Sequence, residues 1–333
     1  MELSTKNLTM KIAKTEHHDK ILDITKEELL YNGMDYLSIA LRPWLEESDG
    51  KYSNRLNVIF TLEDRVVGFR SVYFLNDKKV AIRFAFRISK DIRGKGFGRQ
   101  ATKLLDNHLR YNYPNLTSTL SSIHDLVDSD DDVRSSKHGT LLASKSCPTY
   151  NMPCDELKGL SITNTTKDLS LMSKEKFRTL LKNKDFEQLL PNNLLHVNWI
   201  PIILETEDDI EFLVRKKQIV MAKNHSWDHK KSFSILTLPY HVQNGNLMVS
   251  IDIFTEYGEF VTAHLEQQLL RLKEEVNKQN SAKEFIISIV VNQDLTKVVF
   301  DCMAKLGLQK YYFVSGSQKR EVNNMYIYQK PFQ

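Results

Sequence analysis

Residues 80–111 contain the feature that most limits what this chain can fold into, because an apolar strand, a glycine-rich basic loop and an amphipathic helix follow one another directly. Glycine lets a backbone approach a ligand closely, since it has no Cβ to clash. The first N–H groups of a helix have no intrahelical acceptor, and the helix dipole adds to their attraction for an anion. The pattern therefore predicts a pyrophosphate cradle, with an ordinary glycine-rich turn as the alternative. The loop consists of Arg93, Gly94, Lys95, Gly96, Phe97, Gly98 and Arg99.

Two common nucleotide-binding motifs do not match this loop. A Walker loop has four residues between its glycines and then continues as Gly-Lys-Ser or Gly-Lys-Thr. A Rossmann fingerprint needs an acidic residue on the following strand, about twenty residues after the glycines. No acidic residue stands suitably near residues 116–120. The loop thus indicates a phosphate site of another class.

The spacing Arg93-x-x-Gly96-x-Gly98 resembles the acetyl-CoA-binding signature of the GCN5-related N-acetyltransferases, the GNAT superfamily. This resemblance implies acetyl-CoA as a co-substrate and no metal. Phe97 is expected to pack the helix as well. The residues expected to bind coenzyme A are Arg87, Ile88, Arg93, Gly94, Lys95, Gly96, Phe97, Gly98 and Arg99.

The order of predicted elements in the first half agrees with that superfamily. The pattern of apolar residues and turns gives the order β-α-α-β-β-β-α-β-α-β. We therefore expect an α/β (α+β) acetyltransferase fold with a mixed, mostly antiparallel sheet. The predicted elements are strand 8–13, helical segments 15–30 and 34–45, an antiparallel meander at 56–62, 66–75 and 80–88, helix 97–111, and strands 116–120 and 141–146.

The second half repeats the later part of this order and predicts a second, degenerate acetyltransferase-like lobe. Where the glycine loop would fall, residues 255–259 read Thr-Glu-Tyr-Gly-Glu, and acids at a helix N-terminus repel a phosphate. The alternative is that any α/β sandwich gives a similar string of elements. The predicted elements are strands 218–222, 232–238 and 247–254, helix 259–277, strand 284–291, helix 295–306, and strands 310–314 and 325–328.

Three regions follow from this division. We expect an acetyl-CoA-binding N-acetyltransferase domain at residues 1–150 and an irregular connecting segment at 151–195. The degenerate lobe is expected at residues 196–333.

Residues 31–45 read Tyr-Asn-Gly-Met-Asp-Tyr-Leu and, seven positions after that leucine, Trp-Leu. This segment resembles the Y-x-G-x-D-Y-L…W segment of the histidine N-acetyltransferase-like family. Residues 66–72 and 299–303 agree with the same family. The resemblance implies acetylation of an amino-acid α-amine, which is L-histidine in characterised relatives. Aromatic rings with polar tips suit a small ring-bearing acceptor, although a helix-packing motif capped by Asp35 is an equal alternative. The expected acceptor-binding residues are Tyr31, Asp35, Tyr36, Trp44, Phe84 and Arg87.

The catalytic acid and base remain unassigned in this sequence. Strict strand alternation puts Val80, Ile82, Phe84, Phe86 and Ile88 on one face of their strand and Ala81, Arg83, Ala85 and Arg87 on the other. The family resemblance places a glutamate base where Phe84 stands, and phenylalanine takes no proton. A general-acid tyrosine is likewise replaced in the segment around Ser135, so that Ser135 and Tyr150 are only weak candidates.

Loss of one acid or base group slows an acetyl transfer without abolishing it. A general acid or base contributes about 10²–10⁴-fold, whereas alignment of the reactants contributes on the order of 7–11 kcal/mol. An α-amine titrates near about 8, so part of it is neutral at neutral pH. No Cys or Ser has a base at recognisable spacing, which favours direct attack by the amine over an acyl-enzyme.

Two strand arginines are candidates for binding the carboxylate of an amino acid, which prefers a bidentate guanidinium. Arg87 matches an arginine of the family, whereas Arg83 does not. A salt-bridged or solvated role is favoured for Arg83, and for Arg87 both roles stay open.

The bulk composition favours a cytoplasmic protein with no nucleic-acid or membrane partner. The net charge is +4 over 333 residues, which is too near balance for a nucleic-acid binder. The first twenty residues contain no apolar leader segment, and no run reaches the ~18 apolar residues of a membrane span.

The three cysteines have no Cys-x-x-Cys spacing and are expected to be reduced thiols. His225 and His229 lack a third ligand nearby, so no metal site is expected.

The sequence as a whole predicts an N-acetyltransferase that acts on the amine of a small molecule, such as the free amino acid L-histidine. Two alternatives remain open: a protein or peptide N-terminal acetyltransferase, and a non-catalytic coenzyme-A-binding protein. The acceptor and the oligomeric state are not encoded in any pattern that we find.

Overall fold

The structure is a computed structural model in which the chain divides into two compact units. The first unit comprises residues 1–121 and 330–333, and the second comprises residues 122–329, so the expected boundary at residue 150 falls inside the second unit. The described residues are 8–26, 28, 35–48, 53–124, 138–160, 162, 169–183, 188–215, 218–223, 231–242, 245–276, 284–315, 318–321 and 323–332.

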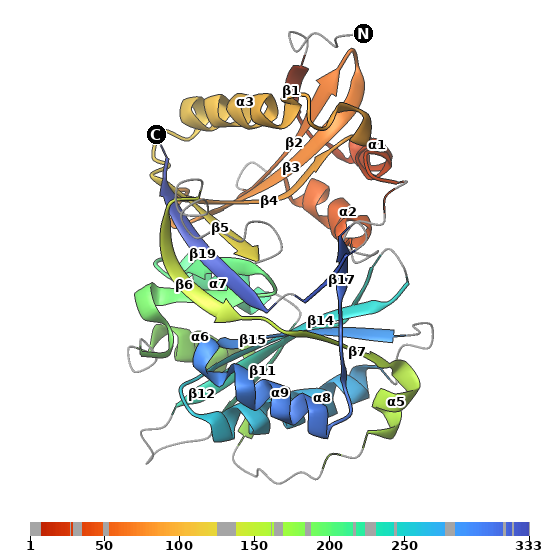
Figure 1. Ribbon diagram of the computed structural model, residues 1–333. Helices are drawn as coiled ribbons and strands as arrows, with labels where there is room; N and C mark the ends of the chain where they lie inside the picture. Colours follow the sequence, from red (N-terminus) through yellow and green to blue (C-terminus); the bar gives the residue numbers. More distant parts are fainter. Residues whose placement is uncertain are drawn as a thin grey trace. The chain divides into compact units, whose positions relative to one another are not determined.

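The first unit is built on a sheet with the strand order β1-β2-β3-β4-β5 (Figure 1). Strands β1 to β4 pair with one another in antiparallel fashion, whereas β4 and β5 pair in parallel. The elements are β1 (Leu8–Ile12), α1 (His18–Asp23), α2 (Leu37–Ser48), β2 (Arg55–Leu62), β3 (Arg65–Leu75), β4 (Val80–Ile88), α3 (Phe97–Asn112) and β5 (Ser118–His124).

The predicted strands and the long helix of the first unit are confirmed to within two residues, apart from β5. The predicted helical segment 15–30 is shorter than expected, since it forms a 3₁₀ turn and the six residues of α1. Strand β5 begins at Ser118 because Leu116 closes a turn onto the carbonyl of Tyr113.

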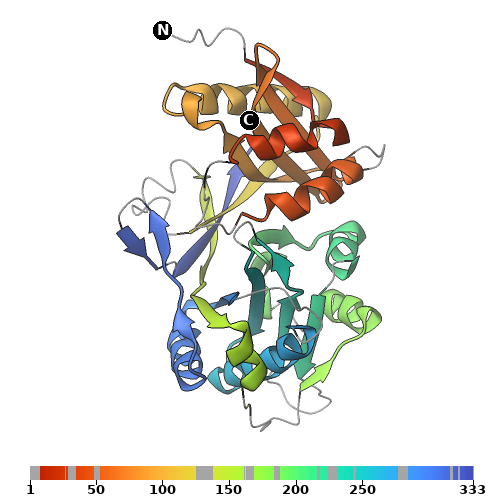
Figure 2. The same ribbon diagram turned by 90° about the vertical axis from the view of Figure 1, so that its right-hand side faces the viewer.

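Helices cover both faces of this sheet. Figure 2 shows α1 and α2, in red and orange, side by side on one face. Their side chains form a core with Ile59 of β2 and Phe69 of β3. Helix α3 covers the opposite face through four fully buried side chains at four-residue spacing, which is the spacing of one helical stripe. These are Phe97, Ala101, Leu105 and Leu109.

A bulge interrupts β4 at Ala85, whose φ of +54° is in the left-handed region. Phe69 of β3 pairs with Arg87, and Ser71 pairs with Phe84, so β4 has one residue more than β3 over this stretch. An extra residue shifts the alternation of side chains by one. Strict alternation along this strand is therefore wrong beyond Phe84. Phe84 and Arg87 face α2, whereas Phe86 and Ile88 face α3.

The parallel strands β4 and β5 pair over three residues, from Val80 with Ser118 to Ile82 with Leu120. Both strands continue for several residues beyond this pairing. The bulged half of β4, from Arg83 to Ile88, therefore lies beyond the paired stretch.

The second unit contains a long mixed sheet with the strand order β19-β6-β15-β14-β12-β11-β8. Its first elements are β6 (Thr140–Ser146), β7 (Thr149–Pro153), α5 (Cys154–Gly159), β8 (Leu169–Leu171), α6 (Lys174–Lys182), β9 (Leu194–Val197), β10 (Ile200–Ile203) and α7 (Glu207–Arg215). The remaining elements are β11 (Gln218–Lys223), β12 (Ser232–Thr237), β13 (Tyr240–His241), β14 (Leu247–Thr255), α8 (Gly258–Val276), β15 (Glu284–Asn292), α9 (Thr296–Lys305), β16 (Gln309–Lys310), β17 (Phe313–Ser315), β18 (Gln318–Arg320) and β19 (Asn324–Pro331).

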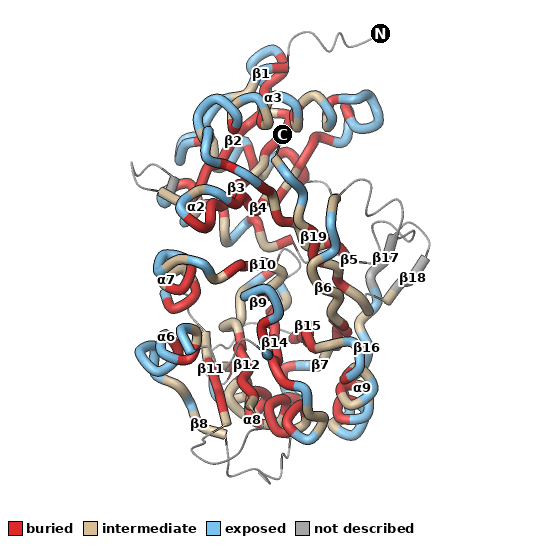
Figure 3. Tube along the Cα trace, turned by 90° about the vertical axis from the view of Figure 1, so that its left-hand side faces the viewer, coloured by how far each residue is buried: buried red, intermediate tan, exposed pale blue. Residues whose placement is uncertain are grey.

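The centre of the second unit repeats the arrangement of the first, with parallel strands β14 and β15 joined through α8. Both strands are buried along nearly their whole length, as the red segments of Figure 3 show. Residues 151–195, which we expected to be irregular, contain α5, β8 and α6. In α5 and α6, the side chains of Leu157, Phe177 and Leu180 are buried. The three cysteines are free, as predicted, and all three are buried.

A buried histidine lies on α8 within the second unit. The Nδ1 atom of His264 is 2.8 Å from the hydroxyl of Ser234, which also accepts a hydrogen bond from Gln268. The side chain is fully buried, and burial lowers the pKa of His264 to about 3 from its ordinary 6.5. The folded state therefore contains the neutral imidazole at neutral pH.

We expect His264 to make the second unit sensitive to acid. Its pKa is lower in the folded state, so the unfolded chain binds the extra proton below pH 6.5. The contribution to stability is complete above pH 6.5 and is lost towards pH 3, by up to about 1.4 kcal/mol for each pH unit. Urea unfolding followed at several pH values should show a shallower loss between pH 6.5 and 4.5 for His264→Gln than for the unchanged protein. Equal slopes for the two proteins would contradict this assignment.

Candidate active site

The glycine loop lies between β4 and α3 and has an open backbone. Gly94 and Gly96 have φ values of +75° and +83°, a region that disfavours residues with a side chain. A Cβ built on either glycine would meet no atom of the described chain within 4 Å. Helix α3 begins at Phe97, immediately after Gly96, so its first N–H groups have no intrahelical acceptor. The loop therefore presents helix-terminal donors next to open space, as an anion site requires.

Several contacts fix the ends of this loop. Ile92 and Phe97 are fully buried. The Nε atom of Arg93 donates to the carbonyl of Ile88 at 2.9 Å, and its two terminal nitrogens lie 2.6 and 2.9 Å from the carboxylate of Glu28. The Arg93 side chain therefore fastens the loop to the end of β4.

The predicted coenzyme-A residues differ in how far their side chains are exposed in this structure. The side chains of Ile88 and Phe97 lie in the core against α3, so these residues can offer only backbone atoms to a ligand. Gly94, Lys95 and Arg99 are exposed. Lys95 donates to the carbonyl of Asp91 at 2.8 Å. The exposed cations together with the helix start suit a pyrophosphate, and the donor set of the loop fits the predicted ligand.

The other face of β4 holds a buried ion pair. A terminal nitrogen of Arg87 lies 2.9 Å from the carboxylate of Asp35, and the side chains are 5% and 10% exposed. The same carboxylate oxygen accepts the backbone N–H of Leu37 at 3.0 Å, at the start of α2. Asp35 therefore both caps the start of α2 and pairs with Arg87. Removing one partner of such a buried pair typically costs about 3–5 kcal/mol.

Aromatic side chains continue this cluster along α2. The rings of Tyr36 and Trp44 are 5.8 Å apart, and Trp44 meets Phe84 edge to face at 5.1 Å. The guanidinium of Arg87 lies 6.0 Å from the Tyr36 ring. The structure thus brings together five of the six expected acceptor residues. Tyr31 lies outside the described residues.

Arg55 is a member of this cluster that sequence reasoning missed. Its guanidinium carbon lies 4.7, 5.2 and 5.3 Å from the ring centres of Trp44, Tyr73 and Phe84. Burial lowers the pKa of Arg55, and the charge of Glu47 opposes that shift. The sequence did contain one signal of this role. Arg55 begins a mostly apolar strand and lies on the same strand face as Asn57, which is also polar.

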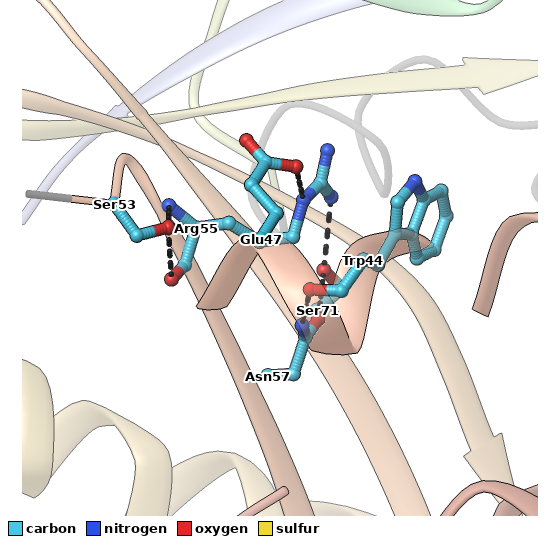
Figure 4. A network of polar contacts seen from close by, with 6 residues as sticks. All are labelled: Trp44, Glu47, Ser53, Arg55, Asn57 and Ser71. Atoms are coloured by element: carbon cyan, nitrogen blue, oxygen red, sulfur yellow. Dashed lines mark hydrogen bonds and ion pairs between the residues drawn. The ribbon is translucent and has the colours of Figure 1, made fainter. Parts of the chain in front are cut away.

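Figure 4 shows the polar network around Arg55. Its Nε donates to Glu47 at 2.6 Å, and a terminal nitrogen donates to the hydroxyl of Ser71 at 3.3 Å. Ser71 in turn donates to the side-chain oxygen of Asn57 at 2.7 Å, and the Asn57 amide donates to the carbonyl of Trp44 at 2.7 Å. This chain of hydrogen bonds connects the sheet to α2 beneath the aromatic rings.

Arg83 lies on the opposite face of β4 from this cluster. Its guanidinium is 2.7 Å from the carboxylate of Asp106 on α3. The salt-bridged role favoured from the sequence agrees with this position.

The structure does not support Tyr150 as a proton donor. Tyr150 lies in β7, in the core of the second unit, and is 2% exposed. Burial raises the pKa of its hydroxyl, which makes it a weaker acid. Ser135 lies outside the described residues, as do His225 and His229.

The start of α8 differs from the start of α3 in a way that fits a degenerate second lobe. A Cβ on Gly258 would meet Val298 of α9 at 3.2 Å, so this helix start is packed rather than open. The side chain of Thr255 already accepts the backbone N–H of Tyr257. Little room remains for an anion there.

None of the described helices is long and apolar enough to cross a membrane. Within the same part of the chain, we find no group of three or more His, Cys, Asp or Glu side chains arranged to hold a metal ion.

Comparisons with known proteins find similar sequences and similar folds among acyltransferases. Residues 165–289 match the family described as "Histidine N-acetyltransferase, C-terminal". A histidine N-acetyltransferase of Scomber australasicus is 22% identical over 270 residues, which is 76% of each chain. A tandem GNAT protein from the clavulanic acid biosynthesis pathway superposes with a TM-score of 0.57 at 11% identity, over 98% of this chain and 99% of that one. N-myristoyltransferase of Saccharomyces cerevisiae, solved with myristoyl-CoA, gives a TM-score of 0.54 at 12% identity, over 97% and 79%.

The glycine loop gives a direct binding prediction. Gly96→Glu should weaken coenzyme-A binding at least about tenfold, because a carboxylate at a helix start repels phosphate. Gly245→Glu is the matched control, since Gly245 has the same φ of +83° and equally open surroundings in the second unit. Calorimetric titration with coenzyme A measures both variants. Unchanged affinity in Gly96→Glu would show that the loop is not the pyrophosphate site.

Proposed function

Since the chain is an acyltransferase of the GCN5-related N-acetyltransferase superfamily and resembles its histidine N-acetyltransferase-like family, we propose that it acetylates a free amino acid with acetyl-CoA. L-Histidine is the first acceptor to test, because the curated relative is a histidine N-acetyltransferase. The amine of a small molecule is the wider substrate class.

One observation carries this proposal. The open glycine loop at the start of α3 directly follows the bulged half of β4, which extends beyond its pairing with β5. A pyrophosphate bound at the helix start would leave the rest of coenzyme A free to follow this strand towards Phe84. The exposed cations of the loop support a charged, phosphate-bearing donor.

The acceptor side of the proposal rests on the cluster beneath α2. Tyr36, Trp44 and Phe84 are each partly exposed and offer flat apolar surfaces. Two buried arginines, Arg55 and Arg87, lie on the same face of the sheet. An acceptor with a small ring and a charged end matches this mixture of surfaces.

The chemistry that we propose is direct attack of the acceptor amine on the thioester. The amine nitrogen bonds to the acetyl carbon, the carbon–sulfur bond breaks, the thiolate leaves, and the amine proton passes to water. Phe84 cannot accept that proton. The residues of this chain therefore contribute by aligning the amine and by excluding water, which is worth on the order of 7–11 kcal/mol in well-aligned cases.

The position of Phe84 also supports a second candidate function, a non-catalytic protein that binds coenzyme A. A pseudoenzyme of this kind would retain the glycine loop and lack proton-transfer groups. Incubation with acetyl-CoA and each free amino acid in turn, with thiol release as the readout, separates the two functions. Release with an amino acid supports the enzyme, whereas coenzyme-A binding with no release supports the second candidate. Release with peptides alone would indicate an N-terminal acetyltransferase.

Placing a carboxylate at position 84 should accelerate the reaction near pH 7 and not near pH 9. Near pH 7 most of the acceptor amine is protonated, so Phe84→Glu should raise kcat about tenfold. This gain is smaller than the usual contribution of a general base, about 10²–10⁴-fold. Near pH 9 the amine is largely neutral, and the gain should nearly vanish. Phe84→Gln is the control, because it has a similar shape and no base. A pH profile of kcat for the three proteins tests this, and an equal gain in Phe84→Gln would contradict the proton-transfer explanation.

A further inference from the structure

We propose that Arg55 binds a carboxylate of the acceptor, so that this protein selects amines that carry a carboxylate over their decarboxylated counterparts. The inference rests on the proposed function and narrows its acceptor class. It assigns a specificity-determining role to a residue that no motif marks.

The first argument is position. Arg55 of β2 pairs directly with Tyr73 of β3, and Ser71 of β3 pairs with Phe84 of β4. Paired residues share one face of a sheet. The guanidinium therefore lies among the partly exposed aromatic rings of the α2 face, 5.3 Å from the ring centre of Phe84.

The second argument is the set of hydrogen-bond donors. Arg55 uses Nε for Glu47 and Nη1 for Ser71. Among the described residues, no side chain or carbonyl accepts a hydrogen bond from its Nη2, which lies on the same edge of the guanidinium as Nε (Figure 4). An arginine stays charged and can donate two parallel bonds to one carboxylate. Nη2 thus retains N–H groups that can donate to a second carboxylate.

The third argument concerns the cost of the charge. The Arg55 side chain is only 7% exposed and its nearest carboxylate, Glu47, is 42% exposed. A buried cation whose counter-charge reaches into water is only partly compensated. The rings of Trp44, Tyr73 and Phe84 stabilise the guanidinium through cation–π contact, yet none of them neutralises it. An incoming carboxylate would complete the compensation.

The other two arginines considered for this role have different surroundings. Arg83 faces α3 and pairs with Asp106. Arg87 pairs with Asp35, which is itself buried, and also donates to the carbonyl of Phe86 at 3.1 Å. Their carboxylate partners are less exposed than Glu47, and both pairs are already enclosed.

The test compares an amino acid with its decarboxylated amine, using L-histidine and histamine with acetyl-CoA and thiol release. The unchanged protein should have the higher kcat/KM for L-histidine. Arg55→Met should lower kcat/KM for L-histidine about 10- to 100-fold, mainly by raising KM, and should change histamine turnover only a few-fold. Arg83→Met is the matched control, because it removes an arginine from the neighbouring strand on the other face. It should leave the preference for L-histidine intact.

Three outcomes would overturn the inference. The first is equal loss for both amines in Arg55→Met, which indicates a packing role. The second is an unchanged protein that acetylates histamine as well as L-histidine. The third is loss of the preference in the Arg83→Met control alone.

Failure of the proposed function gives a different result. If the unchanged protein releases no thiol with either amine, that function fails, and binding decides the inference instead. Titration of L-histidine and histamine into the protein with coenzyme A present then serves as the readout. Binding of L-histidine that disappears in Arg55→Met supports the carboxylate site, and no binding of either compound overturns it. Retained coenzyme-A affinity shows that Arg55→Met is folded.

Discussion

The bulge at Ala85 is the constraint on which the geometry of the first unit depends. One extra residue in β4 changes which side chains face α2, because side chains alternate strictly along an extended strand. Without the bulge, Arg87 would share the face of Arg83 and point towards α3. With the bulge, Arg87 reaches Asp35, and this pair connects β4 to the first residues of α2. Phe84 and Arg87 thereby lie beside α2, whereas Phe86 and Ile88 lie beside α3, whose start carries the glycine loop.

Polar groups on the α2 face are unusual in number for a region that also forms a core. Asn57 and Ser71 are fully buried, and two arginines lie on either side of them. Hydrogen bonds to Glu47, to the carbonyl of Trp44 and to Asp35 connect this network to α2 and to the residues at its start, and they fix α2 over the sheet. An apolar layer would give comparable stability. The retention of charge beside partly exposed aromatic rings is the physical reason to regard this face as a binding surface.

The two units show how one arrangement of elements can leave the start of a helix either open or packed. Helix α3 begins after two left-handed glycines that face open space, whereas α8 begins at a glycine packed against Val298. The dipole of a helix is the same in both units. Access to its first N–H groups decides the difference, and access depends on the residues packed around the turn. The acidic residues 256 and 259 add a repulsive charge at the second site.

The sequence by itself determined most of the elements and the resemblance to the GCN5-related N-acetyltransferases, because hydrophobic periodicity, turn residues and the Arg-x-x-Gly-x-Gly spacing are local properties. It predicted β2, β3, β4 and α3 to within one or two residues, and it predicted five acceptor residues that the structure brings together. It did not predict the bulge, since Ala85 has no side-chain preference for a left-handed backbone and only pairing with β3 reveals the extra residue. For the same reason it missed Arg55, whose contacts come from α2, β3 and β4. Tertiary structure alone decided which arginines lie beside Tyr36, Trp44 and Phe84, because their positions depend on strand register and on the packing of distant segments.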